Sequence, residues 1–236
     1  MKNDALYKVA RFLGSPFAYK CIGLENIHDN GPAIYVANHL GSVRPIEIML
    51  SVPVRFYPWA IAEMTDPQRA PLYLYNDFIH PALHLNGRFG MAMSAVISRL
   101  AVGLINGLGS VSVDRNRGRY MEPLRRSLVL LAEGKNLLIL PEDPAGPPDP
   151  ETHMRPFLCG FILLCSMYQR LTDTPLPIHP LAASSQSRTV SIGRAVFLEP
   201  PGSRRRADIR RVCDQLQEDV QELYKSLQAI PGRVSN

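Results

Sequence analysis

The chain has 236 residues, of which 46% are hydrophobic and 20% charged, and this composition excludes a disordered or collagen-like protein. Lysine and arginine outnumber aspartate and glutamate by 26 to 21, and the net charge of +5 favours an anionic partner such as a phospholipid headgroup, a nucleic acid or an acidic carrier protein. The cysteines show neither CxxC nor CxxH spacing, which argues against structural zinc and a secreted disulfide framework: Cys21, Cys159, Cys165 and Cys213. A reducing cytoplasm is the expected setting.

The amino-terminal segment, residues 1–20, predicts an amphipathic helix rather than a secretory signal, because it has no unbroken apolar run and no small-residue cleavage site. Its apolar face holds Ala5, Leu6, Val9, Phe12 and Leu13. Such a helix either packs on the core or lies on a membrane surface. Further along, residues 91–113 are apolar, but Arg99 and several Gly, Ser and Asn residues make this segment a poor membrane span.

Short apolar runs alternate with helical patterns along the remaining chain, which is typical of an α/β fold. We expect strands at residues 33–37, 54–61, 110–113, 137–140, 176–182 and 189–197. Helices are expected at residues 4–13, 45–51, 92–105, 121–133, 157–171 and 207–228. The sequence therefore predicts a central, mostly parallel mixed sheet flanked by helices, in a single domain over residues 21–236 with an extra segment near 62–109.

The turn at Asn38-His39 is the first candidate for a functional site. It follows the apolar strand at 33–37, and open α/β sheets place their active sites at the carboxyl ends of strands. Because imidazole titrates close to neutral pH, His39 suits a general base. A histidine after a strand is more often structural than catalytic, so position alone does not decide its role.

Several blocks resemble the glycerolipid acyltransferase family, the PlsC-like lysophospholipid acyltransferases. The segment NHLGSVR, beginning at Asn38, is similar to the first motif of that family, in which Asn-His and four further residues precede Asp. GSVSVDR, ending at Arg115, resembles the second motif, whose arginine is thought to hold the acceptor's phosphate. LLILPEDPAG, which contains Glu142, resembles the third, normally Phe-Pro-Glu-Gly-Thr-Arg. TPLPIHPLAAS and VSIGRAVFLEP follow in the order of the family's fourth motif and closing strand.

This resemblance implies a PlsC-like acyltransferase fold and a specific use of His39. In the family, the histidine takes a proton from an acceptor hydroxyl, which then attacks the thioester of acyl-CoA or an acyl carrier protein. An aspartate orients the imidazole, as the carboxylate does in hydrolases. We therefore assign His39 as the catalytic base and no resident cofactor or metal. The residues expected to bind substrate are Asn38, Ser42, Arg44, Arg115, Glu142 and Asp143.

The sequence departs from the family pattern at two of these motifs. Arg44 occupies the position of the aspartate, and a cation cannot accept the imidazole N–H. In the third motif, Asp143-Pro144-Ala145 replaces Gly-Thr-Arg, so an arginine is lost and a carboxylate gained. One hypothesis is that Arg44 and Asp143 form an ion pair across the pocket; the alternative is that both face solvent.

Three functions are compatible with these departures. The first is acyl transfer, with His39 acting alone or with a carboxylate from Glu47, Glu142 or Asp143, to a lipid-like or small alcohol or amine acceptor. The second is a silenced protein that binds acyl chains or an acyl carrier protein. The third is another acyl-handling reaction, such as thioester hydrolysis. We expect a cytoplasmic enzyme of the acyltransferase class, with peripheral contact with the inner face of the membrane as a further expectation.

Other chemistry is less well supported by the sequence. His80 and His84 have a spacing that can bind metal on a helix, but nothing nearby completes a ligand set. The arginines at 204–206, 210 and 211 could meet an anionic headgroup or an acidic carrier, and the absence of a nucleic-acid-binding motif argues against nucleic acid as the partner. No nucleotide-binding loop or nucleophile elbow is present.

Overall fold

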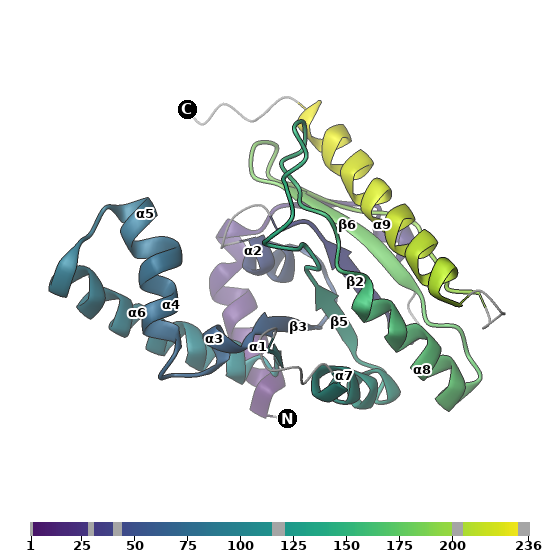
Figure 1. Cartoon of the computed structure of the whole chain (residues 1–236), viewed down its shortest axis with the longest axis horizontal. Helices are drawn as coiled ribbons and strands as arrows, with labels where there is room; N and C mark the ends of the chain where they lie inside the picture. The colour runs from purple at the N-terminus through teal and green to yellow at the C-terminus, as the bar shows by residue number, and fades with distance from the viewer. Residues whose placement is uncertain (1, 28–30, 40–43, 115–120, 200–204, 231–236) are drawn as a thin grey trace. The chain divides into compact units, whose positions relative to one another are not determined.

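The computed structural model describes residues 2–27, 31–39, 44–114, 121–199 and 205–230 (Figure 1). The chain divides into two compact units, which we describe separately. The helical unit consists of Met1–Ala10 and Tyr57–Pro123, and the sheet unit of Arg11–Phe56 and Leu124–Asn236. The single domain expected over residues 21–236 stays a prediction.

The sheet unit contains five described strands in the order β1-β7-β6-β2-β5. Their bounds are β1 Lys20–Ile22, β2 Ile34–Ala37, β5 Asn136–Ile139, β6 Ile178–Ser184 and β7 Thr189–Ile192. The pairs β1–β7, β6–β2 and β2–β5 are parallel, and β6–β7 is antiparallel. This arrangement confirms the expected mixed, mostly parallel sheet. β1 is a strand that the sequence did not indicate.

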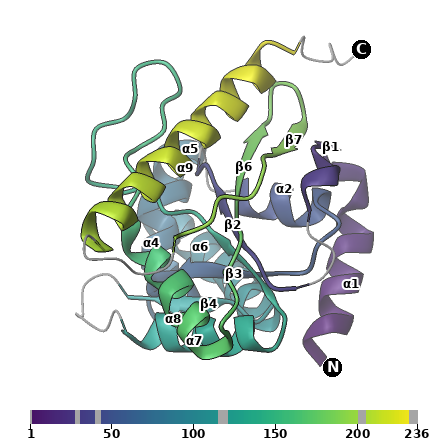
Figure 2. The same ribbon diagram turned by 90° about the vertical axis from the view of Figure 1, so that its right-hand side faces the viewer.

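The two central strands are buried along their whole length, which explains their uninterrupted apolar sequences. All four residues of β2 and all seven of β6 are buried. Helix α9, Arg205–Gln228, packs against β6 and β7, as Figure 2 shows. Its buried positions recur at helical spacing, as the sequence predicts: Val212, Leu216, Val220 and Leu227.

The remaining helices largely follow the predicted positions. They are α1 Lys2–Gly14, α2 Arg44–Ser51, α7 Met121–Ala132 and α8 Leu163–Thr172, with short 3₁₀ segments at Ser15–Phe17, Leu24–Asn26 and Cys159–Ile162. The turn that follows α7 contains Gly134 at φ +75°, with its N–H donating to the Leu131 carbonyl at 3.0 Å. A left-handed glycine is a common helix stop, so the predicted end of this helix has a clear local cause.

The helical unit contains the whole of the extra segment near 62–109. Its strand β3, Phe56–Ile61, pairs in parallel with β4, Val111–Val113. Between them lie α3 Ala62–Thr65, α4 Ala70–Leu74, a π-helical turn Tyr75–Ile79, α5 His80–Leu83 and α6 Gly87–Gly107. The sequence predicts the centre of α6 but none of the shorter helices before it. Single-turn helices carry too little periodicity to be recognised in a sequence.

Among the described helices, α6 is long and apolar enough to cross a membrane, judged by length and composition alone. It begins at Gly87, before the segment that the sequence marked as a poor span because of Arg99. Core helices of soluble proteins can pass the same test, but only 22% of the most apolar window of α6 is buried.

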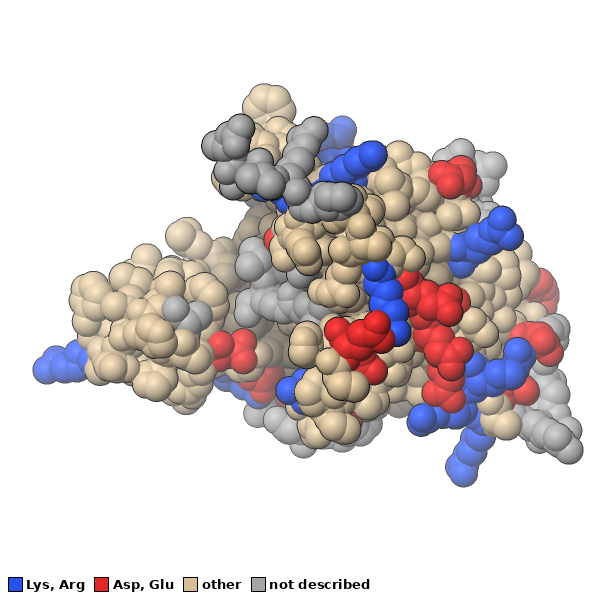
Figure 3. Space-filling view, turned by 90° about the horizontal axis from the view of Figure 1, so that it is seen from above, with Lys and Arg blue, Asp and Glu red and all other residues tan. Residues whose placement is uncertain are grey.

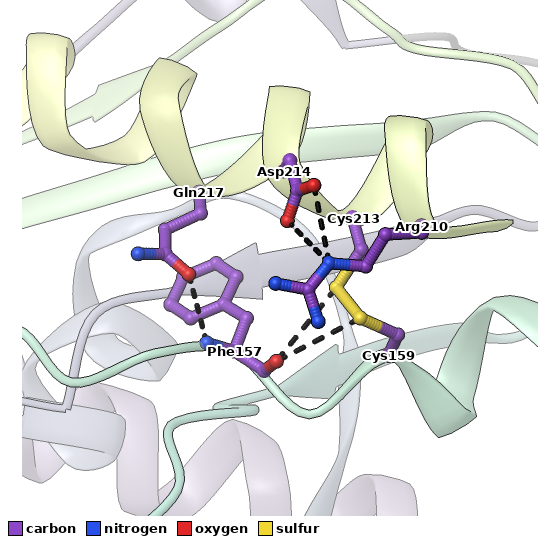
Figure 4. Close-up of a disulfide and its surroundings, with 6 residues drawn as sticks. All are labelled: Phe157, Cys159, Arg210, Cys213, Asp214 and Gln217. Atoms are coloured by element: carbon purple, nitrogen blue, oxygen red, sulfur yellow. Dashed lines mark hydrogen bonds and ion pairs between the residues drawn. A yellow bond between two sulfur atoms is a disulfide. The ribbon is translucent and has the colours of Figure 1, made fainter. Parts of the chain in front are cut away.

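A disulfide joins Cys159, at the start of the 3₁₀ segment before α8, to Cys213 on α9 (Figure 4). The two Cα atoms are 5.5 Å apart, although 54 residues separate the cysteines in sequence. The cysteine spacing argued against a secreted disulfide framework, whereas the structure contains this one disulfide. Burial raises the pKa of the free thiols of Cys21 and Cys165 to about 11 and about 12, so both are protonated at neutral pH and are poor nucleophiles.

Candidate active site at the carboxyl end of strand β2

Asn38 braces the end of β2 against β6. Its side chain is fully buried and accepts a hydrogen bond at Oδ1 from the Ala183 N–H at 2.9 Å. Its Nδ2 donates to the Ala183 carbonyl at 3.2 Å. Both ends of the amide are thus satisfied by one residue of the neighbouring strand. Asn38 therefore fixes where the chain turns, and so where His39 leaves the sheet.

His39 follows this brace and is exposed to solvent. Its backbone N–H donates to Oε1 of Glu142 at 2.5 Å. No described residue forms a hydrogen bond with its imidazole. The backbone is therefore anchored while the side chain is exposed, an arrangement in which the ring can exchange a proton with a bound molecule.

Glu142 connects two segments of the sheet unit through its carboxylate. The residue is 8% exposed; Oε2 accepts the Arg155 N–H at 3.0 Å while Oε1 accepts that of His39. Hydrogen bonds to a carboxylate are stronger than those between neutral groups. Glu142 therefore holds the backbones of His39 and Arg155 on either side of one anionic group.

The loop after β5, residues 140–158, doubles back on itself. Its two arms pair through the Leu158 N–H with the Pro141 carbonyl at 2.9 Å and through the Asp143 N–H with the Pro156 carbonyl at 2.8 Å. Oδ1 of Asp143 accepts the Ala145 N–H at 3.0 Å, so this carboxylate supports a turn. The proline-rich segment is thus an ordered irregular loop, as expected from residues that cannot donate backbone hydrogen bonds.

Arg155 is a candidate site residue that the sequence did not indicate. It is half-buried, and its Nη1 donates to the Gly146 carbonyl within the third-motif segment. Because Arg155 follows Glu142 by 13 residues, no short-range pattern links the two. The guanidinium of Arg155 thus lies beside the segment that resembles the family's third motif.

The tip of this loop is held by Asp149 and by an ion pair to α9. Hydrogen bonds from the N–H and the hydroxyl of Thr152 lower the pKa of the half-buried Asp149 carboxyl. Lys225 on α9 lies 2.6 Å from Glu151, and this hydrogen-bonded carboxylate raises the pKa of the Lys225 ammonium. These contacts fix the arm of the loop that carries Arg155.

The other predicted residues are placed as follows. Glu47, on α2, accepts a hydrogen bond from the Tyr19 hydroxyl. Arg44 begins α2, but its side chain lies outside the described residues, as do Ser42 and Arg115 entirely. The ion pair between Arg44 and Asp143, and the second-motif arginine, therefore stay predictions.

A cavity of about 420 Å³ in the sheet unit opens at the amino ends of β2 and β5 rather than near His39. Its wall includes Tyr35, Arg55 and Asn136.

Among the residues the structure describes, no three His, Cys, Asp or Glu side chains gather as metal ligands would. His84 lies beyond the end of α5 in a left-handed conformation, with φ of 53°, so it is not on one helix with His80.

Comparison with known proteins adds the fold relationship. No protein-family model matches the sequence, and no curated protein matches it. A solved structure is similar: the 1-acyl-sn-glycerophosphate (LPA) acyltransferase PlsC from Thermotoga maritima, with a TM-score of 0.56 and 15% sequence identity. The match covers 99% of this chain and 83% of that chain. The chain therefore has a PlsC-like fold.

Proposed function

We propose that the protein is an acyltransferase that moves a fatty acyl group from an acyl-CoA or acyl-carrier-protein thioester to a lipid-like or small alcohol or amine acceptor. The observation that carries this proposal is the exposed His39, anchored by Glu142 at the carboxyl end of a central strand in a PlsC-like fold. His39 is the proposed base. The proposal requires no resident cofactor.

The proposed reaction uses the imidazole twice. His39 removes the acceptor's proton as the acceptor oxygen or nitrogen attacks the thioester carbonyl carbon. The carbon–sulfur bond then breaks, and the proton passes from the imidazolium to the departing thiolate. Without an aspartate at position 44, the imidazolium lacks the carboxylate that stabilises it in the family pattern.

A second candidate function follows from that same position. Arg44 would disfavour a protonated imidazole if its guanidinium lay close to the ring. A silenced PlsC-like protein would then bind an acyl chain or an acyl carrier protein without transferring the acyl group.

Thioester consumption by the purified full chain tests these proposals. Acyl-CoA and acyl-carrier-protein donors of several chain lengths are offered with lysophospholipid, alcohol and amine acceptors, and products are identified by mass. We expect the wild type to form an acylated acceptor. Turnover by Arg44→Asp alone would support the silenced protein, whereas free fatty acid without acylated acceptor would indicate hydrolysis. Consumption of no thioester by either protein would contradict an acyltransferase.

Arg155 is proposed to supply the cation for an anionic group of the donor or acceptor. Replacing it with methionine keeps the apolar stem but removes the charge, so the KM for that substrate is expected to rise by about 10-fold, the equivalent of one charge-assisted hydrogen bond. The matched control is Arg170→Met, at an exposed position on α8. A KM unchanged for every charged substrate would exclude Arg155 from binding.

A further inference from the structure

Helix α6 has an unusual distribution of residue sizes between its two faces. Its buried residues are small or β-branched and recur every four residues: Gly90, Ser94, Ser98 and Val102. Three large apolar side chains instead face outwards, with Phe89 65%, Val96 62% and Leu100 73% exposed. A helix in a water-soluble core shows the opposite arrangement.

The small residues allow α6 to approach α4 closely. Ser94 Oγ donates to the Pro71 carbonyl of α4 at 2.6 Å. A Cβ added at Gly90 would lie 2.3 Å from the carbonyl oxygen of Leu85, in the turn that leads into α6, so a larger residue does not fit there either. Helices that pack through small residues and hydroxyl hydrogen bonds while presenting large apolar side chains outwards are typical of helices in lipid. The packing of this helix therefore does not depend on burying its large apolar residues in protein.

The exposed face forms one continuous strip along the helix. Phe89, Val96 and Leu100 lie at spacings of seven and four, with Ala92 and Gly103 exposed between and beyond them. Twenty-one residues of helix extend roughly 31 Å. We call these five residues the α6 strip. Figure 3 shows the surface of the α4–α6 region to be mostly uncharged on the side in view.

The charges beside the strip are positive. Arg88 and Arg99, both exposed, are eleven residues apart, which is three helical turns, so they lie along the same edge of the strip. No aspartate or glutamate occurs in residues 78–113. Arginines beside an exposed apolar face match an anionic lipid surface, in which the apolar side chains enter the acyl region and the guanidinium groups meet the headgroups.

We infer that the α6 strip is a membrane-binding surface that lies in the interface of a bilayer containing anionic lipid. This surface is distinct from α1, which the sequence marks as a possible membrane contact and whose Val9, Phe12 and Leu13 are also exposed. The inference does not depend on whether the protein transfers acyl groups.

Vesicle flotation of the full chain tests the inference, with phosphatidylcholine vesicles prepared with and without phosphatidylglycerol. The variant Val96→Glu/Leu100→Glu is expected to lower partitioning by about 100-fold, because two exposed apolar side chains would enter lipid as carboxylates. The matched control Val129→Glu/Leu171→Glu places the same changes at exposed Val and Leu residues of the sheet unit and is expected to bind like the wild type. Circular dichroism checks that each variant is folded.

Two further variants separate the alternatives. Arg88→Gln and Arg99→Gln are each expected to weaken binding about fivefold, and only to vesicles with phosphatidylglycerol. Strip variants that float with vesicles as well as the wild type would overturn the inference. So would a loss of binding seen only in the α1 variant Phe12→Glu/Leu13→Glu, and so would a wild type that binds neither kind of vesicle. A strip variant that changes only the oligomeric state in solution would instead assign the strip to a second copy of the chain.

Discussion

Replacement of His39 by alanine is expected to lower the rate of acyl transfer by about 10²- to 10⁴-fold, the usual contribution of a general base. Because His39 is exposed and its anchoring hydrogen bond to Glu142 is made by the backbone N–H, alanine preserves that contact. The free energy of unfolding should therefore change little. The measurement is the initial rate of product formation on the best donor and acceptor, together with urea unfolding of both proteins.

The matched control is His80→Ala, which removes another exposed imidazole, in the helical unit. It is expected to keep the wild-type rate. A His39→Ala rate within a few-fold of the wild type would exclude general-base catalysis by this residue. Loss of rate with unchanged acyl-chain binding would separate catalysis by His39 from a role in binding alone.

Removal of the disulfide is expected to lower the free energy of unfolding by about 4 kcal/mol, from the entropy of an unfolded loop closed across 54 residues. Both sulfur atoms lie near the Phe157 carbonyl oxygen, at 3.7 and 3.8 Å, and the Phe157 N–H donates to Gln217 on α9 at 2.8 Å (Figure 4). The disulfide thus reinforces the joint between α9 and the arm of the loop that carries Arg155. Urea unfolding of Cys159→Ser/Cys213→Ser measures the effect.

Two comparisons make this measurement specific. The wild type in reductant should unfold at the same urea concentration as the double variant, and Cys21→Ser, which removes a free thiol, should unfold close to the oxidised wild type. An oxidised wild type and a double variant with equal midpoints would show that the bond contributes nothing to stability. Activity measured on the same samples would show whether the joint also supports the site.

The sequence predicted the strands β2 to β7 and the long helices because each has a local signature. The apolar run before Asn38 marks β2, and Gly134 marks the turn after α7. β1 was missed because three residues, one exposed and two half-buried, have no distinctive pattern, and α3 to α5 because each is only one turn or so long. The α/β fold with its mostly parallel sheet thus followed from local patterns alone.

The motifs showed where in the sequence the candidate site lies, but they did not predict the contacts between its residues. The sequence placed His39 after a strand, and Glu142 in a segment that resembles the family's third motif. It did not indicate that the Glu142 carboxylate would hold the backbones of His39 and Arg155, or that Asp143 would support a turn. Each of these contacts depends on a loop that folds back on itself. Such an irregular loop has no repeating apolar pattern, so its contacts cannot be predicted from the sequence.

Local sequence patterns and long-range contacts thus determine different features of this protein. Residue periodicity and turn chemistry act over a few positions, so the sequence by itself determined the elements, the strand that ends at Asn38-His39 and the basic balance of the chain. Contacts across long separations were decided by the tertiary structure: Asn38 with Ala183, 145 residues apart, and Cys159 with Cys213, 54 apart. The exposed face of α6 was also decided by the tertiary structure, because an apolar helix of this length has the same composition whether its large side chains contact protein or lipid. Only packing against α4 through small residues showed which face was left exposed.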